Sequence, residues 1–428
     1  MKKSNYNIFV EVSPVETLVF NGITKRFFKI SSENIPHLLD VLEFPDKYIH
    51  KEEYINLVSR LNDNGFIVND NIDEMEILRK LFISYKESPE YSLMILSTYS
   101  CNFSCWYCIQ RHQNENLNES TIQKIEKHIS KYLTENNIKS FQISWFGGEP
   151  LLNFKAIRKI CTFAQKLCNK KGISYSSGIT TNGSLITPYM AIEMKELGFK
   201  DFQITIDGIK DNHNKTRYNA VIPDSYSLIL NNIKLLAETI PNVEITIRFN
   251  FTHQNLNDLI VDQLDSELNS VIDKVEVLFR KVWQELDSSE LTNKVGIILK
   301  KFQDKGYKVL HDYDNFKLTS CYVEQTHYNA IFPDGTVDKC SNVDISETRG
   351  YLSDSGDIIW NTFPDENTVN IFNHPSDCAE CPYLPLCMGP CPKHRKTYLF
   401  DGKIHCYVEN KDRIFSDEIK NFSLLNLK

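Results

Sequence analysis

The sequence predicts an α/β protein built around an open, partial (β/α)6 barrel, with a winged-helix-like module before it and a cysteine-rich domain after it. Strand and helix patterns alternate from about residue 91 to 285, a different pattern precedes them, and seven of the twelve cysteines lie between residues 321 and 406. A chain of 428 residues also exceeds what one hydrophobic core usually serves. We therefore expect three domains, at residues 1–88, 89–309 and 310–428.

The first 88 residues combine short strands with helices. Alternating apolar runs predict three strands, at residues 7–12, 17–22 and 26–31. Helical patterns follow at residues 34–44, 52–65 and 72–88, and the last of them predicts a linking helix. This order of elements is compatible with a small winged-helix-like module.

The central segment repeats a strand and then a helix. Its strand candidates are residues 91–99, 141–146, 173–181, 202–207, 243–251 and 274–280. Helical runs between them include residues 121–133, 155–168 and 225–240. Repeated βα units imply a parallel sheet, and about six units make an open barrel rather than a closed eight-fold one. We expect functional residues at the carboxyl ends of these strands.

Composition narrows the class of protein. The chain is 41% hydrophobic and 11% aromatic, which is ordinary for a folded protein, and its formal net charge is -8. It has neither the apolar run of a signal peptide nor that of a membrane-spanning helix. We expect a cytoplasmic protein with no nucleic-acid or membrane partner, in which cysteines serve as metal ligands or catalysts rather than as disulfides.

Three cysteines follow the first predicted strand of the central segment, at Cys101, Cys105 and Cys108. Three thiolates can bind three irons of a [4Fe–4S] cluster and leave the fourth iron open for chemistry. The alternative is a zinc site, but zinc usually takes four protein ligands. The nearby His112 lies in a polar run that we expect at the surface, so the iron cluster is favoured.

The CxxxCxxC spacing, with Tyr107 before the last cysteine, resembles the signature of the radical S-adenosylmethionine (radical SAM) superfamily. The resemblance extends to Gly147, Gly148 and Glu149, which follow the second predicted strand. It implies that these residues contact the amino group of S-adenosylmethionine (AdoMet). Glycine permits close backbone approach, and a carboxylate can accept hydrogen bonds from an ammonium group.

Further family-like runs follow the third, fourth and fifth strands, at residues 180–186, 204–217 and 248–251. By this resemblance Asn182, Thr205 and Arg217 are candidate AdoMet-pocket residues, although each could instead cap a turn or pair on the surface. The resemblance also implies a reductive mechanism, in which an electron from a reductant such as flavodoxin or ferredoxin breaks AdoMet into methionine and a 5′-deoxyadenosyl radical. It assigns no catalytic base.

The tail carries a second set of cysteines, whose order resembles the SPASM domain of radical SAM peptide maturases. Gly335 precedes one of them in a GxxxxC pattern; the seven are Cys321, Cys340, Cys378, Cys381, Cys387, Cys391 and Cys406. The resemblance implies two auxiliary [4Fe–4S] clusters, and so three clusters in all. One would be held by Cys378, Cys381, Cys387 and Cys406. The other would be held by Cys321, Cys340 and Cys391, with no obvious fourth thiolate, and a pair of structural zinc sites is the alternative.

Two further cysteines, Cys161 and Cys168, lie two helical turns apart among apolar residues of the helical run 155–168. We expect them to be buried small hydrophobic residues rather than ligands.

The SPASM resemblance points to peptide substrates. Residues 1–85 are also loosely similar to recognition elements that bind a leader peptide by adding it as a strand to a sheet edge. We therefore expect a maturase that installs a thioether or carbon–carbon crosslink in a ribosomally made precursor peptide.

Two alternatives stay open. One is an anaerobic sulfatase-maturing enzyme, which generates formylglycine; there an aspartate follows the cysteine of GxxxxC, whereas Ser341 stands here. The other is a zinc-stabilised peptide-binding protein without catalysis, which metal content would distinguish.

Overall fold

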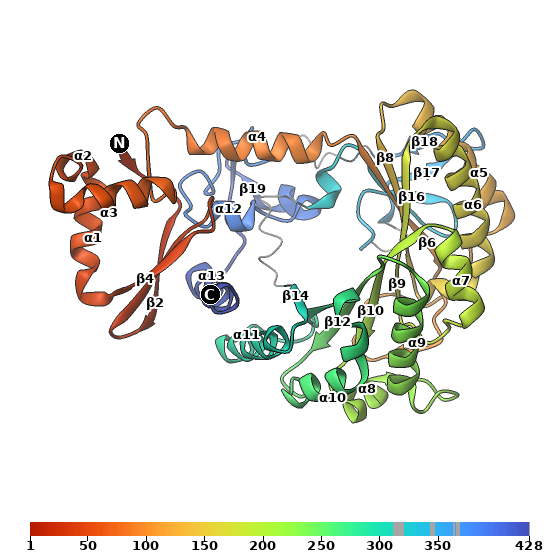
Figure 1. Ribbon diagram of the computed structural model, residues 1–428. Coiled ribbons are helices and arrows are strands. Elements are labelled where there is room, and N and C mark those ends of the chain that lie inside the picture. Colours follow the sequence, from red (N-terminus) through yellow and green to blue (C-terminus); the bar gives the residue numbers. More distant parts are fainter. Residues whose placement is uncertain (311–320, 343–346, 363, 365–368, 428) are drawn as a thin grey trace.

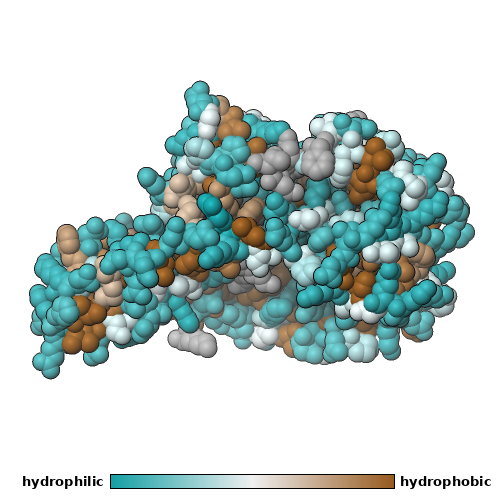
Figure 2. Space-filling view, turned by 90° about the horizontal axis from the view of Figure 1, so that it is seen from above, coloured by the Kyte–Doolittle hydropathy of each residue, from teal (hydrophilic) through white to brown (hydrophobic). Residues whose placement is uncertain are grey.

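The computed structural model describes residues 1–310, 321–342, 347–362, 364 and 369–427. A small N-terminal unit lies at one end of the molecule, and the large sheet with its helices lies at the other (Figure 1). Seen from above, the N-terminal unit is the narrow end, and most of the visible surface is hydrophilic (Figure 2). None of the described helices is long and apolar enough to cross a membrane.

The large sheet has eleven strands in the order β14-β13-β12-β10-β9-β8-β6-β15-β16-β17-β18. The six strands predicted for the central segment lie side by side in it and pair in parallel. They are β6 (Glu90–Thr98), β8 (Ser140–Gly147), β9 (Ser174–Thr181), β10 (Phe199–Ile206), β12 (Glu244–Phe251) and β13 (Val275–Lys281). The predicted α/β fold with a mostly parallel sheet is thus confirmed.

Helices connect these strands, as the alternating pattern predicted. They are α5 (Glu119–Glu135), α6 (Phe154–Lys171), α7 (Pro188–Glu196), α8 (Lys210–Thr216), α9 (Ser225–Thr239), α10 (Leu259–Leu268) and α11 (Ser289–Asp304). Figure 1 shows α5, α6, α7 and α9 along one side of the sheet. The main apolar core lies between the strands and these helices, and Cys161 and Cys168 are fully buried in it. Their interpretation as small hydrophobic residues is confirmed.

The tail of the protein extends the same sheet, which the sequence analysis did not predict. β14 (Lys308–Leu310) pairs with β13, and β15 (Tyr328–Ile331) pairs in parallel with β6. A meander of three short strands follows: β16 (Thr336–Asp338), β17 (Gly350–Leu352) and β18 (Ile358–Trp360). Strands of three or four residues are too short to show a clear alternation of apolar and polar side chains.

The N-terminal unit contains the three predicted strands as an antiparallel sheet in the order β2-β3-β4. Its elements are β1 (Lys2–Lys3), β2 (Asn7–Ser13), β3 (Glu16–Asn21), β4 (Phe27–Ser31), α1 (Ile35–Glu43), α2 (Pro45–Tyr48), α3 (Glu52–Asp63) and β5 (Ile67–Val68). The predicted linking helix is α4 (Glu74–Lys86), which runs towards the large sheet (Figure 1). The description of the unit as winged-helix-like stays a prediction.

The C-terminal helix α13 (Lys411–Asn426) packs against this N-terminal sheet. The rings of Phe20 and Phe422 meet edge to face at 5.8 Å, and Ile8 belongs to the same apolar cluster. This helix was not predicted, although Phe415, Ile419 and Phe422 form a helical apolar face. The other α-helix and strands described in the tail are α12 (Leu384–Cys387), β19 (Leu399–Phe400) and β20 (Lys403–Ile404), and 3₁₀ helices lie at η4 (Tyr322–Glu324) and η6 (Pro392–Tyr398).

Candidate functional site: the cysteine sets at the carboxyl edge of the sheet

The first cysteine loop begins directly after β6. Within it β7 (Ser104–Cys105) pairs with β11 (Arg217–Tyr218), so that Cys105 lies opposite Arg217. Burial raises the pKa of the Cys101 thiol to about 11, and the charges of Glu149 and Cys105 add to this. Burial also raises the pKa of Cys105, to which the charge of Cys108 contributes. The three thiols therefore lie close enough to influence one another.

His112 lies at the surface, as expected, and its Nε2 is 3.5 Å from the Sγ of Cys108. Partial desolvation of its ring lowers the pKa of His112, which favours its neutral form. In the described part of the protein no three cysteine, histidine, aspartate or glutamate side chains are grouped so that they could hold one metal ion. A cubane instead binds each thiolate to a different iron, so thiolates that hold a cluster need not meet at one metal ion.

Two glycines allow the end of β8 to approach the start of the cysteine loop closely. A Cβ on Gly147 would collide with the carbonyl oxygen of Thr98, and a Cβ on Gly148 would collide with that of Ser100. Gly147 also has a φ of 132°, which other residues rarely adopt. The amide of Gly148 donates to the oxygen of Thr98 at 3.0 Å, and so the GGE run holds the start of the cysteine loop.

Glu149 is fully buried at the same edge. Its carboxylate accepts hydrogen bonds from the Thr181 hydroxyl at 2.6 Å, the Asn182 amide at 2.7 Å and the Leu151 amide at 3.0 Å. Burial raises its pKa, and these hydrogen bonds oppose the rise. The observed contacts make Glu149 a link between β8 and β9, while its contact with an ammonium group stays a prediction.

The other predicted AdoMet residues lie on neighbouring strands. The side-chain amide of Asn182 donates to Asn102 Oδ1 at 2.8 Å, which places Asn182 against the cysteine loop. Thr205 is buried in β10, where it pairs with Arg248 of β12.

Arg217 belongs to a buried polar network beneath the loop. Its Nη1 donates to the Tyr107 hydroxyl at 2.7 Å, and that hydroxyl donates to Asp207 Oδ2 at 2.6 Å. Asn250 also donates to Tyr107, at 3.1 Å. Burial raises the pKa of Asp207, whereas the Arg217 guanidinium lowers it. Asp207 and Asn250 were not predicted as site residues, although both are polar and lie in the runs 204–217 and 248–251 at strand ends.

Two atoms of this network provide a test of whether AdoMet fits. Arg217 Nε and Asp207 Oδ1 are buried and have no hydrogen-bond partner among the described residues. Buried polar atoms rarely stay unpaired in a native protein. AdoMet carries a carboxylate, an ammonium group and hydroxyl groups, so it can supply both a missing acceptor and a missing donor. The residues present therefore fit this cosubstrate.

The resemblance divides the tail cysteines into two sets, and this division stays a prediction. The first set, Cys378, Cys381, Cys387 and Cys406, lines one cavity together with Tyr383 and Tyr407. Burial raises the pKa of Cys378 to about 12, and the charges of the other three thiols add to it.

The second set consists of Cys321, Cys340 and Cys391. Burial raises the pKa of Cys321 to about 11, and the charges of Cys340 and Cys391 raise it further. Iron binding by both sets, and the fourth ligand of the second, stay predictions.

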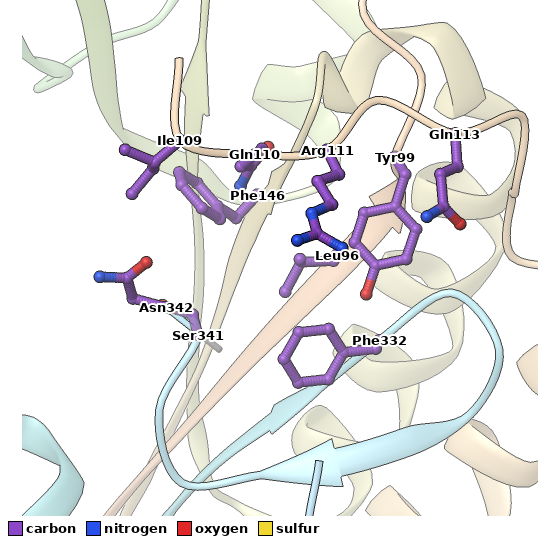
Figure 3. A pocket seen from close by; sticks show the side chains of 10 residues that line it. All are labelled: Leu96, Tyr99, Ile109, Gln110, Arg111, Gln113, Phe146, Phe332, Ser341 and Asn342. Carbon is purple, nitrogen blue, oxygen red and sulfur yellow. The ribbon is translucent and has the colours of Figure 1, made fainter. Parts of the chain in front are cut away.

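A pocket of about 330 Å³ lies between the first cysteine loop and the loop of Cys340 (Figure 3). Residues that follow Cys108 and residues that follow Cys340 form opposite parts of its wall, and strand residues lie between them. The lining consists of Leu96, Tyr99, Ile109, Gln110, Arg111, Gln113, Phe146, Phe332, Ser341 and Asn342. The pocket is therefore next to two of the three cysteine sets.

The protein has a mostly parallel α/β sheet with a cysteine triplet and a GGE run at its carboxyl edge. These features resemble those of the radical SAM superfamily, and the comparisons with known proteins point to the same class. Residues 95–261 match the radical SAM superfamily. The protein therefore contains a radical SAM domain.

Two curated relatives match most of the sequence. The radical SAM cyclopropyl synthase TigE of Paramaledivibacter caminithermalis is 25% identical in an alignment 398 positions long, which covers 80% of this chain and 78% of TigE. The cysteine-type anaerobic sulfatase-maturating enzyme of Clostridium novyi is 23% identical in an alignment 374 positions long, which covers 77% of this chain and 92% of that enzyme. The solved structure of native anSMEcpe with bound AdoMet has a TM-score of 0.57 at 18% identity, covering 78% of this chain and 98% of that one. This last likeness concerns the fold.

Proposed function

We propose that this radical SAM enzyme is a peptide maturase that installs a thioether or carbon–carbon crosslink in a ribosomally made precursor peptide. The pocket between the first cysteine loop and the Cys340 loop carries the proposal. A substrate there lies beside the proposed site of radical formation and beside an auxiliary set of thiolates, and a [4Fe–4S] cluster held by these thiolates would accept an electron afterwards. An enzyme that abstracts a hydrogen atom and then oxidises the substrate radical needs both a site of radical formation and an electron acceptor.

The N-terminal unit offers a place for a leader peptide. In the described residues β4 pairs only with β3, so its outer edge is free to pair with an added strand. Beside that edge lies a cavity of about 500 Å³, lined by Arg26, Phe27 and Phe28 and by the α3 residues Asn56 and Leu57, among others. An extended peptide can add to β4 through its backbone and place alternate side chains in this cavity.

The proposal includes three [4Fe–4S] clusters and AdoMet. The cysteine sets described above hold the clusters, and Glu149, Asn182, Thr205 and Arg217 surround AdoMet with Gly147 and Gly148. With these groups bound, the site is supplied with a 5′-deoxyadenosyl radical able to remove a hydrogen atom from an unactivated carbon. A flavodoxin or ferredoxin of the cytoplasm supplies the electron.

The test is anaerobic purification and reconstitution, followed by metal analysis. We expect about twelve irons per protein molecule, from three clusters of four, and formation of 5′-deoxyadenosine after reduction. Co-expression with a short peptide encoded beside this gene should change the mass of that peptide by the loss of hydrogen. Zinc in place of iron, or iron without cleavage of AdoMet, would overturn the proposal and favour the zinc-stabilised binding protein.

Sulfatase maturation is the second candidate, because the Clostridium novyi enzyme matches 77% of this chain. Against it, Ser341 lines the pocket at the position where the sulfatase-maturing family is expected to carry an aspartate. Incubation with a sulfatase-derived peptide and trapping of an aldehyde with a hydrazide separates the two. An aldehyde product would favour this second candidate.

A further inference from the structure

We propose that the residue from which this enzyme abstracts hydrogen has an apolar side chain, aliphatic or aromatic, rather than the thiol or hydroxyl of cysteine or serine. The inference rests on the proposed function, since it specifies the substrate of the same pocket. It follows from the composition of the pocket walls and from the separation of the pocket from the predicted AdoMet residues.

The floor of the pocket comes from three neighbouring strands. Leu96 of β6 and Phe146 of β8 lie near the carboxyl ends of their strands, and Phe332 directly follows β15, which pairs with β6 on its other side. Leu96 and Phe332 are each 1% exposed. Together with Tyr99 and Ala330 they form an apolar cluster separate from the main core.

Figure 3 shows the rings of Tyr99 and Phe332 and the side chains of Leu96 and Phe146 facing the same space. The Tyr99 and Phe332 rings lie 6.5 Å apart at their centroids. On the loop above them Ile109 is 50% exposed and adds a further apolar wall. A side chain that enters here exchanges water for apolar contacts, which favours hydrocarbon and penalises an unpaired hydroxyl or thiol.

The polar groups of the pocket suit a peptide backbone. Gln110, Gln113 and Asn342 carry neutral amides, each able to donate and to accept a hydrogen bond. Of the ten lining residues that the structure describes, none has a carboxylate or an imidazole, and Arg111 has a guanidinium. A thiol or hydroxyl substrate would therefore find neither a carboxylate nor an imidazole in the wall to take its proton.

Ser341 does not replace such a base. Its hydroxyl lies 3.2 Å from the hydroxyl of Tyr322, so one of the two groups donates a hydrogen bond to the other.

The pocket is distinct from the predicted AdoMet contacts, because none of the six predicted AdoMet residues lines it. Its wall nevertheless begins at Ile109, the residue after Cys108, so a substrate there is beside the first cluster. The reaction is a hydrogen-atom transfer: a C–H bond of the substrate residue breaks, and the hydrogen with one electron joins the 5′ carbon of the deoxyadenosyl radical. The products are 5′-deoxyadenosine and a carbon-centred substrate radical, and a low-potential one-electron reductant supplies the electron that cleaved AdoMet.

The experiment offers single residues to the complete enzyme. Reconstituted full-length protein is mixed anaerobically with AdoMet, dithionite and the N-acetyl amide of leucine, phenylalanine, serine or cysteine, each deuterated in its side-chain carbons and supplied at equal concentration. Mass spectrometry then measures deuterium in 5′-deoxyadenosine. We expect leucine or phenylalanine to transfer at least about tenfold more deuterium than serine or cysteine, a ratio typical of apolar pockets.

A second measurement needs no turnover. Saturation-transfer NMR of the same four probes, with AdoMet and without reductant, should show stronger binding of leucine or phenylalanine. Transfer and binding that favour serine or cysteine, or that are equal or absent for all four probes, would overturn the inference. Absence of 5′-deoxyadenosine in every reduced sample would instead count against the proposed function, and the NMR ranking would still decide the inference.

Variants connect the preference to the pocket. Phe332→Ser and Ile109→Asn should each lower the ratio of leucine to serine binding at least about fivefold. Ile109 is half exposed on a loop, so its replacement does not threaten folding. Ile359→Asn is the matched control, since Ile359 is an exposed apolar residue of β18 outside the pocket and its replacement should leave the ratio unchanged.

Discussion

The helix-covered sheet and the cysteine-rich tail are held together by different forces. In the sheet, residues such as Ile143 and Ile157 are fully buried between strands and helices, and no predicted metal ligand is needed for that core. In the tail, α12 has four residues, β19 and β20 have two each, and four cysteines line one cavity. Such short elements bury too little to be stable alone. The sheet should therefore fold without iron, whereas this part of the tail should depend on it.

The largest expected effect is a loss of AdoMet cleavage that leaves the stability of the sheet unchanged. Cys105→Ala removes one of the three thiolates proposed to hold the first cluster, so AdoMet cleavage should fall at least about a thousandfold. The sheet should keep its stability, since Cys105 lies in a loop outside the main core. Chromatography of 5′-deoxyadenosine measures the first effect, and the thermal unfolding midpoint measures the second.

Cys161→Ala is the matched control for that variant. Cys161 is fully buried in α6, so its replacement should cost about 1 kcal/mol of stability and leave AdoMet cleavage near its normal rate. Normal cleavage by Cys105→Ala would show that the first cysteine loop does not carry the reaction.

The next prediction tests the dependence of the tail on its thiols. Cys387→Ala should spare part of the AdoMet cleavage but abolish peptide modification. It should also lower hydrogen-exchange protection at least about tenfold in α12 and α13. The loss should extend to the N-terminal sheet, because Tyr383 stacks on Phe415 at 4.7 Å and Gly22 packs against Pro385. Helices α5 and α6 are the internal reference, and equal protection in both proteins would refute the proposed difference between the two regions.

A smaller effect is expected from Glu149→Gln, at the joint between β8 and β9. The new side-chain NH2 would face groups that now donate hydrogen bonds to the carboxylate, so donor would meet donor. We expect the free energy of unfolding to decrease by about 2 to 3 kcal/mol. Chemical denaturation measures this loss, and binding of AdoMet to the reconstituted protein should weaken in parallel. Glu135→Gln, at an exposed helix end, should change stability by less than about 0.5 kcal/mol. Unaltered stability of Glu149→Gln would mean that the buried carboxylate does not join the strands.

The two regions were also predictable from the sequence to different degrees. Alternating apolar residues and helical periods located all six central strands, because a buried sheet under helices imposes a regular pattern. In the tail only the cysteines were predicted as functional residues, and their grouping was implied by the resemblance to the SPASM domain. The short strands β15 to β18 carry too few residues to show a period. The apolar face of α13 was readable and was missed.

The buried network at the first loop was beyond sequence reasoning for a different reason. Tyr107 lies 100 residues before Asp207 and 110 before Arg217, and it meets them because β7 pairs with β11. Nothing local in the sequence specifies that pairing. The polar residues at strand ends indicated where a site would lie, but not which of them would contact one another.

The smallest expected effect concerns the joint between the two regions. His128 of α5 is 4% exposed; its Nε2 lies 2.7 Å from the Tyr91 hydroxyl and its Nδ1 lies 2.9 Å from the carbonyl oxygen of Gly356 in the tail. Burial lowers the pKa of His128 from 6.5 to about 4. Between pH 4 and pH 6.5 the unfolded protein therefore binds more protons at His128 than the folded protein does. The contribution of His128 to the free energy of unfolding is complete above about pH 6.5 and decreases as the pH falls towards 4.

At pH 5.5 the loss from His128 should be about 1 kcal/mol relative to pH 7.5. Urea denaturation at the two pH values measures it. His128→Gln lacks the titrating group, and the difference in pH dependence between the two proteins isolates this histidine from the others. Because Nδ1 contacts the tail, the hydrogen-exchange protection of Gly356 and Asp357, corrected for the slower intrinsic exchange at the lower pH, should decrease before the protection of the sheet core does. An identical pH dependence of both proteins would mean that His128 is not buried in its neutral form at this joint.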